Sequence, residues 1–176
     1  MIAYRDPYGS VESSVSIRGR TRKSQHKGTA MASLTLAQAS TIVDVALQKG
    51  RATNSAPLVA AVLDAGGHLV AFKREDKAEI MRFDIAYGKA WGALGMGFGS
   101  RQLAVRAATN PVFFSALAVA SGGRFVPVPG GVLIRDDAGE IIGAVGVSGD
   151  VSDRDEECAL AGIEAAGLKA DPGAPQ

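Results

Sequence analysis

The chain contains few of the residues that build covalent or metal-bound structure. Its 176 residues include one cysteine, Cys158, and two histidines. A single cysteine excludes an internal disulfide and a zinc site made from several cysteines. Because Cys158 falls within a helical pattern, we expect it to be a small core residue. Aromatic residues make up 6% of the chain while glycine occurs 22 times, so the predicted core consists of small aliphatic side chains in close backbone contact.

Long apolar runs are also missing. No run reaches the length of a transmembrane helix, and no continuous apolar stretch of a signal peptide follows the basic N-terminal residues. We therefore expect a cytoplasmic protein that is not bound to a membrane. The net charge is +1, but residues 1–30 hold six of the 19 basic residues and two of the 18 acidic residues. The remainder is mildly acidic, which argues against a nucleic-acid surface.

The length fits one domain. Residues 1–33 are polar, basic and without periodicity, and they are predicted to be a flexible extension. Residues 34–168 form the predicted domain, and residues 169–176 are expected to be a frayed tail. Within the domain, Thr35 and Gln38 match a capping box that starts a helix. Further helices are predicted over residues 80–94, from Ser100 to Ala108, after Asn110-Pro111, and from Ser152.

Apolar runs paired by turns predict the strands. Residues 58–63 and 69–72 flank a turn containing Gly66-Gly67, and a second hairpin spans residues 125–149. Hairpins and short links favour an antiparallel sheet in an α+β domain. The last run, residues 141–149, has a face that shrinks towards Ser148, with Gly149 at its end. Glycine within a strand indicates that something approaches closely, which is either a packed helix, a subunit or a flat ligand.

Few residues of the domain are suited to chemistry. His68, in the first turn, is a possible single haem ligand or an exposed turn residue. Lys89 lies among alanines on a helix, and Asp76 with Lys89 is a candidate acid–base pair if the protein is an enzyme. Arg124 is a candidate partner for an anionic group. A serine triad at Ser148 is not expected, because the surrounding residues break the Gly-x-Ser-x-Gly pattern.

Several segments together resemble the GlcG/HbpS-like family, also called the haem-degrading domain family, which includes the C-terminal domain of PduO-type proteins. The resemblance covers roughly residues 34–168 and rests on a sequence of motifs: residues 62–72, Lys89-Ala90, Pro129-Gly130-Gly131, residues 142–149, Asp155-Glu156 and Ala161-Gly162. It implies a five-stranded antiparallel sheet flanked by helices, similar to profilin and sensor domains. It also implies homo-oligomers, with haem or iron bound by some members, accessory roles in small-molecule catabolism for others, and lyase activity in a few.

One departure from the family pattern concerns the haem ligand. Many members carry a histidine shortly before the Gly-Gly that precedes the Pro-Gly-Gly strand, whereas residues 118–124 here contain none. A substitute ligand would have to come from Thr109, Tyr87 or His68. We therefore predict a small-ligand-binding protein with haem as the leading ligand and no metal site of its own. The predicted pocket includes Lys89 and the remaining residues of the expected site, namely Arg124, Gly130, Gly131, Ser148 and Gly149.

Two alternatives remain open at this point. The first is a lyase or hydrolase-like enzyme acting on a small aromatic or hydroxy acid. The second is a non-catalytic subunit whose bare strand end docks a partner protein. Each makes a different demand on the structure, since an enzyme needs Asp76 close to Lys89, and a docking subunit needs an exposed apolar patch.

Overall fold

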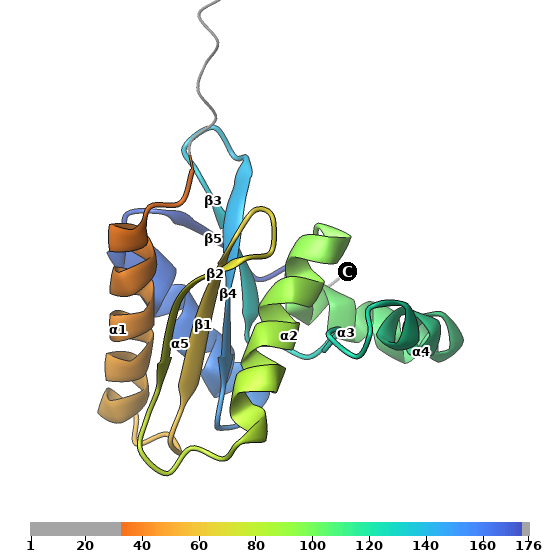
Figure 1. Ribbon diagram of the computed structural model, residues 1–176, viewed down its shortest axis with the longest axis horizontal. Helices are drawn as coiled ribbons and strands as arrows, with labels where there is room; N and C mark the ends of the chain where they lie inside the picture. Colours follow the sequence, from red (N-terminus) through yellow and green to blue (C-terminus); the bar gives the residue numbers. More distant parts are fainter. Residues whose placement is uncertain (1–32, 174–176) are drawn as a thin grey trace, which may run out of the picture. The chain divides into compact units, whose positions relative to one another are not determined.

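The computed structural model describes residues 33–173 (Figure 1), so the predicted N-terminal extension lies outside the described residues except for Ser33. The elements, in chain order, are α1 (Leu36–Ala52), β1 (Val59–Asp64), β2 (Leu69–Arg74), α2 (Met81–Met96), α3 (Ser100–Thr109), α4 (Pro111–Ala120), β3 (Gly131–Arg135), β4 (Ile141–Ser148), α5 (Ser152–Ala165) and β5 (Lys169–Asp171).

The five strands form one sheet in the order β2-β1-β4-β3-β5, and every neighbouring pair is antiparallel. The two predicted hairpins are β1–β2 and β3–β4. The predicted class, an α+β domain with a five-stranded antiparallel sheet flanked by helices, is confirmed.

Helices cover both faces of this sheet. Ile42 of α1 and Ile163 of α5 pack with Val62 and Val145 on one face, and Ala90 and Ala93 of α2 pack on the other with Leu63 and its neighbours. Figure 1 shows α1 and α5 together on one side of the strands and α2 on the opposite side. Because β1 and β4 are covered on both faces, their side chains are apolar in both alternating sets.

Short-range signals set several helix ends. Thr35 and Gln38 form the predicted capping box, and the Asn110 side chain accepts a hydrogen bond from the Phe113 N–H ahead of Pro111 at the start of α4. Ser100 is the first residue of α3, but its side chain makes no capping hydrogen bond. Its hydroxyl instead accepts a hydrogen bond from the Gly131 N–H, at 2.7 Å, and so ties α3 to the start of β3.

The chain end also differs from the prediction. Lys169–Asp171, expected within a frayed tail, forms β5 and pairs with β3. Arg135 of β3 holds this short strand through an ion pair with Asp171, 2.8 Å from Nη2 to Oδ2. The three-residue strand is too short for an alternating pattern to reveal it, so the prediction failed for lack of signal.

Helices α3 and α4 form an arm beside the sheet. Figure 1 shows α4 projecting away from the strands beyond α3. A small cluster of Leu103, Phe114 and Phe125 joins this arm to the domain. The arm lies next to the C-terminal end of α2, and the site described below is formed at that junction.

Candidate ligand groove

The space predicted beside the end of β4 is filled. A Cβ atom at Gly146 would overlap the carbonyl oxygen of Ala86 in α2, and one at Gly149 would overlap that of Pro57. The missing side chains therefore let a helix and a loop approach the strand, as glycine allows. The prediction of a ligand pocket at this strand end was wrong. The alternative prediction, that the bare strand end docks a partner protein, was also wrong, because Ser148 and Gly149 are buried.

Lys89 fills the centre of this junction. The residue is 1% exposed, and its Nζ donates to the Val147 carbonyl at 2.9 Å and to Asp155 Oδ2 at 2.8 Å. Gly130, with φ of +109°, makes room for the ammonium group, because a Cβ there would lie 2.9 Å from Nζ. Gly131 packs as closely against the Lys89 backbone. The predicted pocket residues of this group thus form a closed contact between helix and sheet.

The buried pair has shifted proton affinities. Burial lowers the pKa of Lys89 and raises the pKa of Asp155, and the mutual attraction of the two charges opposes both shifts. Asp155 gains further support from the Asp150 N–H, which donates to its Oδ1 at 3.1 Å. Every charged atom of the pair that the structure describes therefore has a partner, as a buried ion pair requires.

The proposed acid–base pair of Asp76 and Lys89 is not formed. Asp76 is exposed in the loop after β2 and lines a shallow surface depression with Arg51 and Glu75. Lys89 is already bonded to Asp155 and is closed to solvent. General acid–base chemistry needs a group within hydrogen-bond reach of a substrate, which this geometry does not provide.

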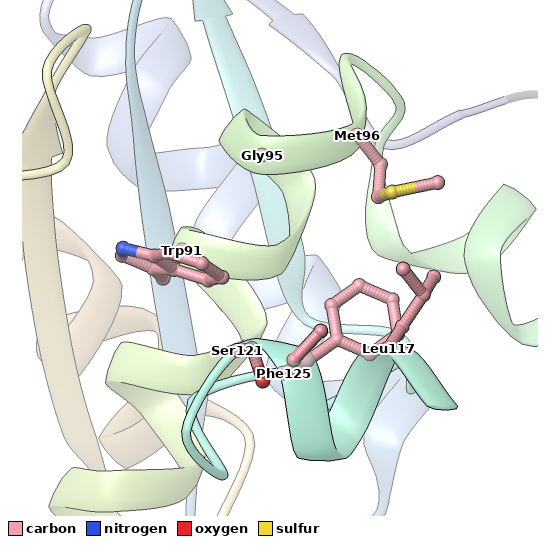
Figure 2. A pocket seen from close by; sticks show the side chains of 7 residues that line it. Trp91, Gly95, Met96, Leu117, Ser121 and Phe125 are labelled. Atoms are coloured by element: carbon pink, nitrogen blue, oxygen red, sulfur yellow. The ribbon is translucent and has the colours of Figure 1, made fainter. Parts of the chain in front are cut away.

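An apolar groove lies instead around Trp91, two residues further along α2. It consists of two depressions that share Trp91 and Gly95, and we call it the Trp91 groove. The larger, of about 190 Å³, lies between α2 and α4 (Figure 2) and is lined by Trp91, Gly95, Met96, Leu117, Ala120, Ser121 and Phe125. The smaller, of about 150 Å³, adjoins the β1–β2 turn and is lined by Ala65, Gly66, Gly67, Trp91, Leu94 and Gly95.

A positive charge lies over the tryptophan of this groove. The guanidinium carbon of Arg124 is 4.5 Å from the centre of the Trp91 ring, a cation–π contact. Its Nε donates to the Ser121 carbonyl at 3.0 Å, which fixes the side chain. Within residues 33–173, Arg124 makes no ion pair with a carboxylate. A cation held at the edge of an apolar groove in this way is suited to an acidic ligand.

Of the three candidate haem ligands, Tyr87 and His68 lie beside the groove and Thr109 does not. The Tyr87 hydroxyl donates to the Gly67 carbonyl at 3.2 Å, beside the smaller depression. His68 follows in the same turn, and its exposed ring lies 3.2 Å from both carboxylate oxygens of Asp64. The His68 backbone N–H lowers the pKa of Asp64 by hydrogen bonding to that carboxylate. Thr109 donates to the Arg106 carbonyl at the end of α3 and does not line the groove.

Sequence reasoning missed most of the groove lining. Trp91, Met96, Leu117 and Phe125 fit helix and core patterns, and nothing in those patterns marks a side chain that borders a cavity. One signal was present. Four glycines follow Trp91 within residues 92–99. Because glycine has no side chain, this segment leaves space beside the large tryptophan ring, which favours a surface depression there.

The comparisons with known proteins agree with this fold. A family model described as "Haem degrading protein HbpS-like" matches residues 34–164. The chain belongs to the HbpS-like family. This membership confirms the resemblance inferred from the motifs of residues 62–72 and 142–149.

Individual relatives are more distant. An uncharacterized 15.0 kDa protein of the dhaT-dhaS intergenic region in Citrobacter freundii is 29% identical over 130 residues, which cover 74% of this chain and 89% of that protein. A crystal structure of a PduOC:haem complex superposes with a TM-score of 0.71 at 23% identity, over 78% of this chain and 98% of that one. The HbpS of Streptomyces reticuli, crystallised as a double mutant, gives 0.66 at 25% identity over 88% and 97%.

Proposed function

We propose that this protein binds haem in the Trp91 groove and does so as a homo-oligomer. The observation that carries the proposal is the pairing of an exposed apolar groove with Arg124, a cation stacked on its tryptophan and without a carboxylate partner in the described part of the chain. Haem combines a flat apolar ring with two carboxylates, so it matches both features. The family description and the haem complex of a structural neighbour support the same ligand.

The groove fits one part of such a ligand. Its two depressions, of about 190 and 150 Å³, are each smaller than the roughly 300 Å³ at which pockets for drug-sized ligands begin. The ring of a porphyrin would therefore contact Trp91 and the apolar lining along one side, while Arg124 binds a propionate. Tyr87 and His68 adjoin the Gly66-Gly67 wall, so they are better placed to ligate iron than Thr109.

Trp91 provides a direct test, because it is the one tryptophan of the chain. Titration with haemin should quench the intrinsic fluorescence and shift the Soret band with the same midpoint. Replacement Gly95→Leu should fill the space shared by both depressions and weaken haem binding by at least about tenfold, or 1.4 kcal/mol. Quenching that is absent, or a Gly95→Leu variant that binds haem as tightly as the wild type, would contradict the proposal.

The role of Arg124 needs a ligand control. Arg124→Gln should weaken binding of haem and leave binding of haem dimethyl ester, which has no free carboxylates, nearly unchanged. The variants His68→Ala, Tyr87→Phe and Thr109→Ala then identify the iron ligand, since only its removal should change the position of the Soret band. If Arg124→Gln weakens both ligands equally, the arginine shapes the groove without binding carboxylate.

A further inference from the structure

The turn between β1 and β2 is built around an imidazole ring. The Oδ1 atom of Asp64 accepts hydrogen bonds from the Gly66 N–H at 2.8 Å and from the His68 N–H at 2.9 Å. The His68 ring folds back over this turn, so that its Nδ1 lies 3.2 Å from each oxygen of the same carboxylate. A Cβ atom at Gly66 would lie 2.8 Å from the ring atom Cε1. The ring therefore occupies the space that a side chain at position 66 would need.

The second hairpin provides a comparison within the same molecule, because its turn is closed in the same way. Asp136 takes the place of Asp64: each donates its backbone N–H to the carbonyl of the residue four positions later. Each side chain also accepts a hydrogen bond from the backbone N–H of that later residue. The fourth residue of both turns is a glycine with positive φ, +80° at Gly67 and +87° at Gly139. The Asp–backbone hydrogen bonds are thus turn chemistry that does not require a histidine.

The two turns differ where the imidazole lies. The third residue is Gly66 in the first turn and Ala138 in the second, and the fifth residue is His68 in the first and Glu140 in the second. Ala138 shows that this turn accepts a side chain at its third position. Gly66 has no positive φ that would require glycine. The glycine at position 66 is therefore explained by the imidazole ring beside it and not by the turn.

The carboxylate determines which ring nitrogen of His68 is free. Asp64 is ionised at neutral pH, because the backbone N–H of His68 lowers its pKa. An ionised carboxylate only accepts hydrogen bonds, so it holds the proton of the neutral ring on Nδ1. The unshared electron pair then lies on Nε2, which makes no hydrogen bond within residues 33–173. Since the His68 side chain is 81% exposed, Nε2 is accessible to a ligand.

The imidazole lies at the edge of the Trp91 groove. Gly66, which the ring covers, and Gly67 both line the smaller depression. A Cβ atom at Gly67 would lie 3.4 Å from Cδ1 and Nε1 of Trp91, and Figure 2 shows the nitrogen of this indole pointing away from Phe125. Trp91 therefore contacts the turn along one edge, while Arg124 stacks on its ring.

We infer that Asp64 is a positioning residue, which holds His68 with Nδ1 protonated so that Nε2 ligates the haem iron, and that Gly66 provides the room for the ring. The choice of haem rests on the proposed function, whereas the position of the imidazole does not. Haem iron needs one axial side chain, so a single histidine is sufficient. A carboxylate hydrogen-bonded to the other ring nitrogen fixes the tautomer and makes the imidazole a stronger ligand. Tyr87, in contrast, uses its hydroxyl proton on the Gly67 carbonyl.

The first test needs no haem. Asp64→Asn keeps one oxygen for the backbone N–H groups of the turn, and it thereby directs the amide NH2 towards Nδ1 of His68. Because Nδ1 must then accept a hydrogen bond, the proton of the neutral ring moves to Nε2. Proton–nitrogen correlation spectra in alkaline buffer should show the Nδ1–H tautomer in the wild type and the Nε2–H tautomer in Asp64→Asn. His26→Gln in both proteins leaves His68 as the one histidine of the chain. The same tautomer in both proteins would overturn the inference.

The second test measures the bound iron. Asp64→Asn should shift the Soret band and weaken haem binding by about tenfold or more, because ligation then needs the disfavoured tautomer. The reduction potential should rise, since a less basic imidazole stabilises ferric iron less. Asp136→Asn, in the equivalent turn of the second hairpin, is the matched control and should leave all three properties unchanged. Equal effects of the two substitutions, or no effect of Asp64→Asn, would overturn the inference.

Gly66→Ala separates the position of the ring from the stability of the fold. The atoms in the way of the new methyl group are at the movable end of the His68 side chain, and the second turn already contains Ala138. The melting temperature should therefore change little, as thermal unfolding would show. The ring should leave the carboxylate, so haem binding should weaken nearly as much as in His68→Ala. A Gly66→Ala variant with the Soret band and haem affinity of the wild type would overturn the role of Gly66.

The two proposals fail in different ways. If the wild type binds no haem but Asp64→Asn still changes the tautomer of His68, the proposed function fails and the positioning of the imidazole stands. If haem binds and Arg124→Gln weakens it, but neither His68→Ala nor Asp64→Asn shifts the Soret band, the proposed function stands and His68 is not the iron ligand. Support for the inference requires both the change of tautomer and the shift of the Soret band.

Discussion

The two halves of α2 have opposite surroundings although they are one continuous helix. From Ala86 to Ala90 the helix is sealed against β3 and β4, with the charge of Lys89 buried on Asp155. Further along, Trp91, Leu94, Gly95 and Met96 line the groove, and Gly95 is exposed. Beside the first half, glycines of the facing strands bring backbones together, whereas in the second half Gly95 leaves space.

This contrast shows that the structural role of a glycine depends on the atoms that face it. A Cβ at Gly146 would overlap the Ala86 carbonyl, whereas one at Gly95 would meet only the Trp91 ring, 3.7 Å away. Both glycines lie in apolar segments of regular structure, so the local sequence does not separate them. Substitution of Gly146, which faces the first half, and of Gly95, in the second half, should therefore change the stability of the protein in opposite directions.

The largest effect is expected from removal of a buried charge in the sealed half. Asp155→Ala leaves the Lys89 ammonium, which is almost fully buried, without its carboxylate. We expect a loss of about 3–5 kcal/mol in the free energy of unfolding, measured by urea titration. The double variant Asp155→Leu with Lys89→Met should lose clearly less, since no charge stays unpaired.

The pH dependence of Asp155→Ala provides a check. Burial already lowers the pKa of Lys89, and loss of the opposing carboxylate lowers it further. Between that lowered pKa and the ordinary lysine value, the unfolded chain binds more protons than the folded one, so stability rises with pH. The deficit relative to wild type should shrink between pH 7 and pH 10. A deficit that grows over this range would contradict the unpaired lysine as its cause.

A smaller effect tests the glycines directly. Gly146→Ala should cost about 3 kcal/mol, because backbone of α2 must move away from β4. Gly95→Ala should instead stabilise the protein by up to about 1 kcal/mol, since alanine is the better helix former and has room. Thermal unfolding of the two variants measures both changes. Similar losses in the two would show that the half of α2 beside the groove is as tightly packed as the other.

The last test changes no residue and concerns α5, which covers the face of the sheet opposite α2. Cys158 of α5 is 1% exposed, and burial raises its pKa to about 11. Because only the thiolate reacts, labelling by a disulfide reagent at pH 8 should be at least about a hundredfold slower than for a free thiol. Absorbance should report one reactive thiol per chain after unfolding in urea. Fast labelling of the native protein would mean that α5 opens readily.

Patterns in the sequence predicted most of the fold and little of the site. Capping signals at Thr35 and Asn110 are local, so they set helix starts correctly, and turn chemistry identified both hairpins. The partner of Lys89 is Asp155, 66 residues away, and no short-range rule links such distant charges. The Trp91 groove depends on how the α3–α4 arm folds back beside α2, which is likewise a long-range arrangement.

The end of the chain has a practical consequence for anyone who expresses this domain. The match to the family stops at residue 164, yet the Pro172 carbonyl accepts a hydrogen bond from the Arg101 N–H, and Gly99 packs directly against Pro172. The last described residues therefore hold the start of α3 to the sheet. A protein that ends at residue 164 would lose β5 and the contacts of Pro172 with Gly99 and Arg101. Those contacts position α3, and with it α4, which forms one wall of the groove.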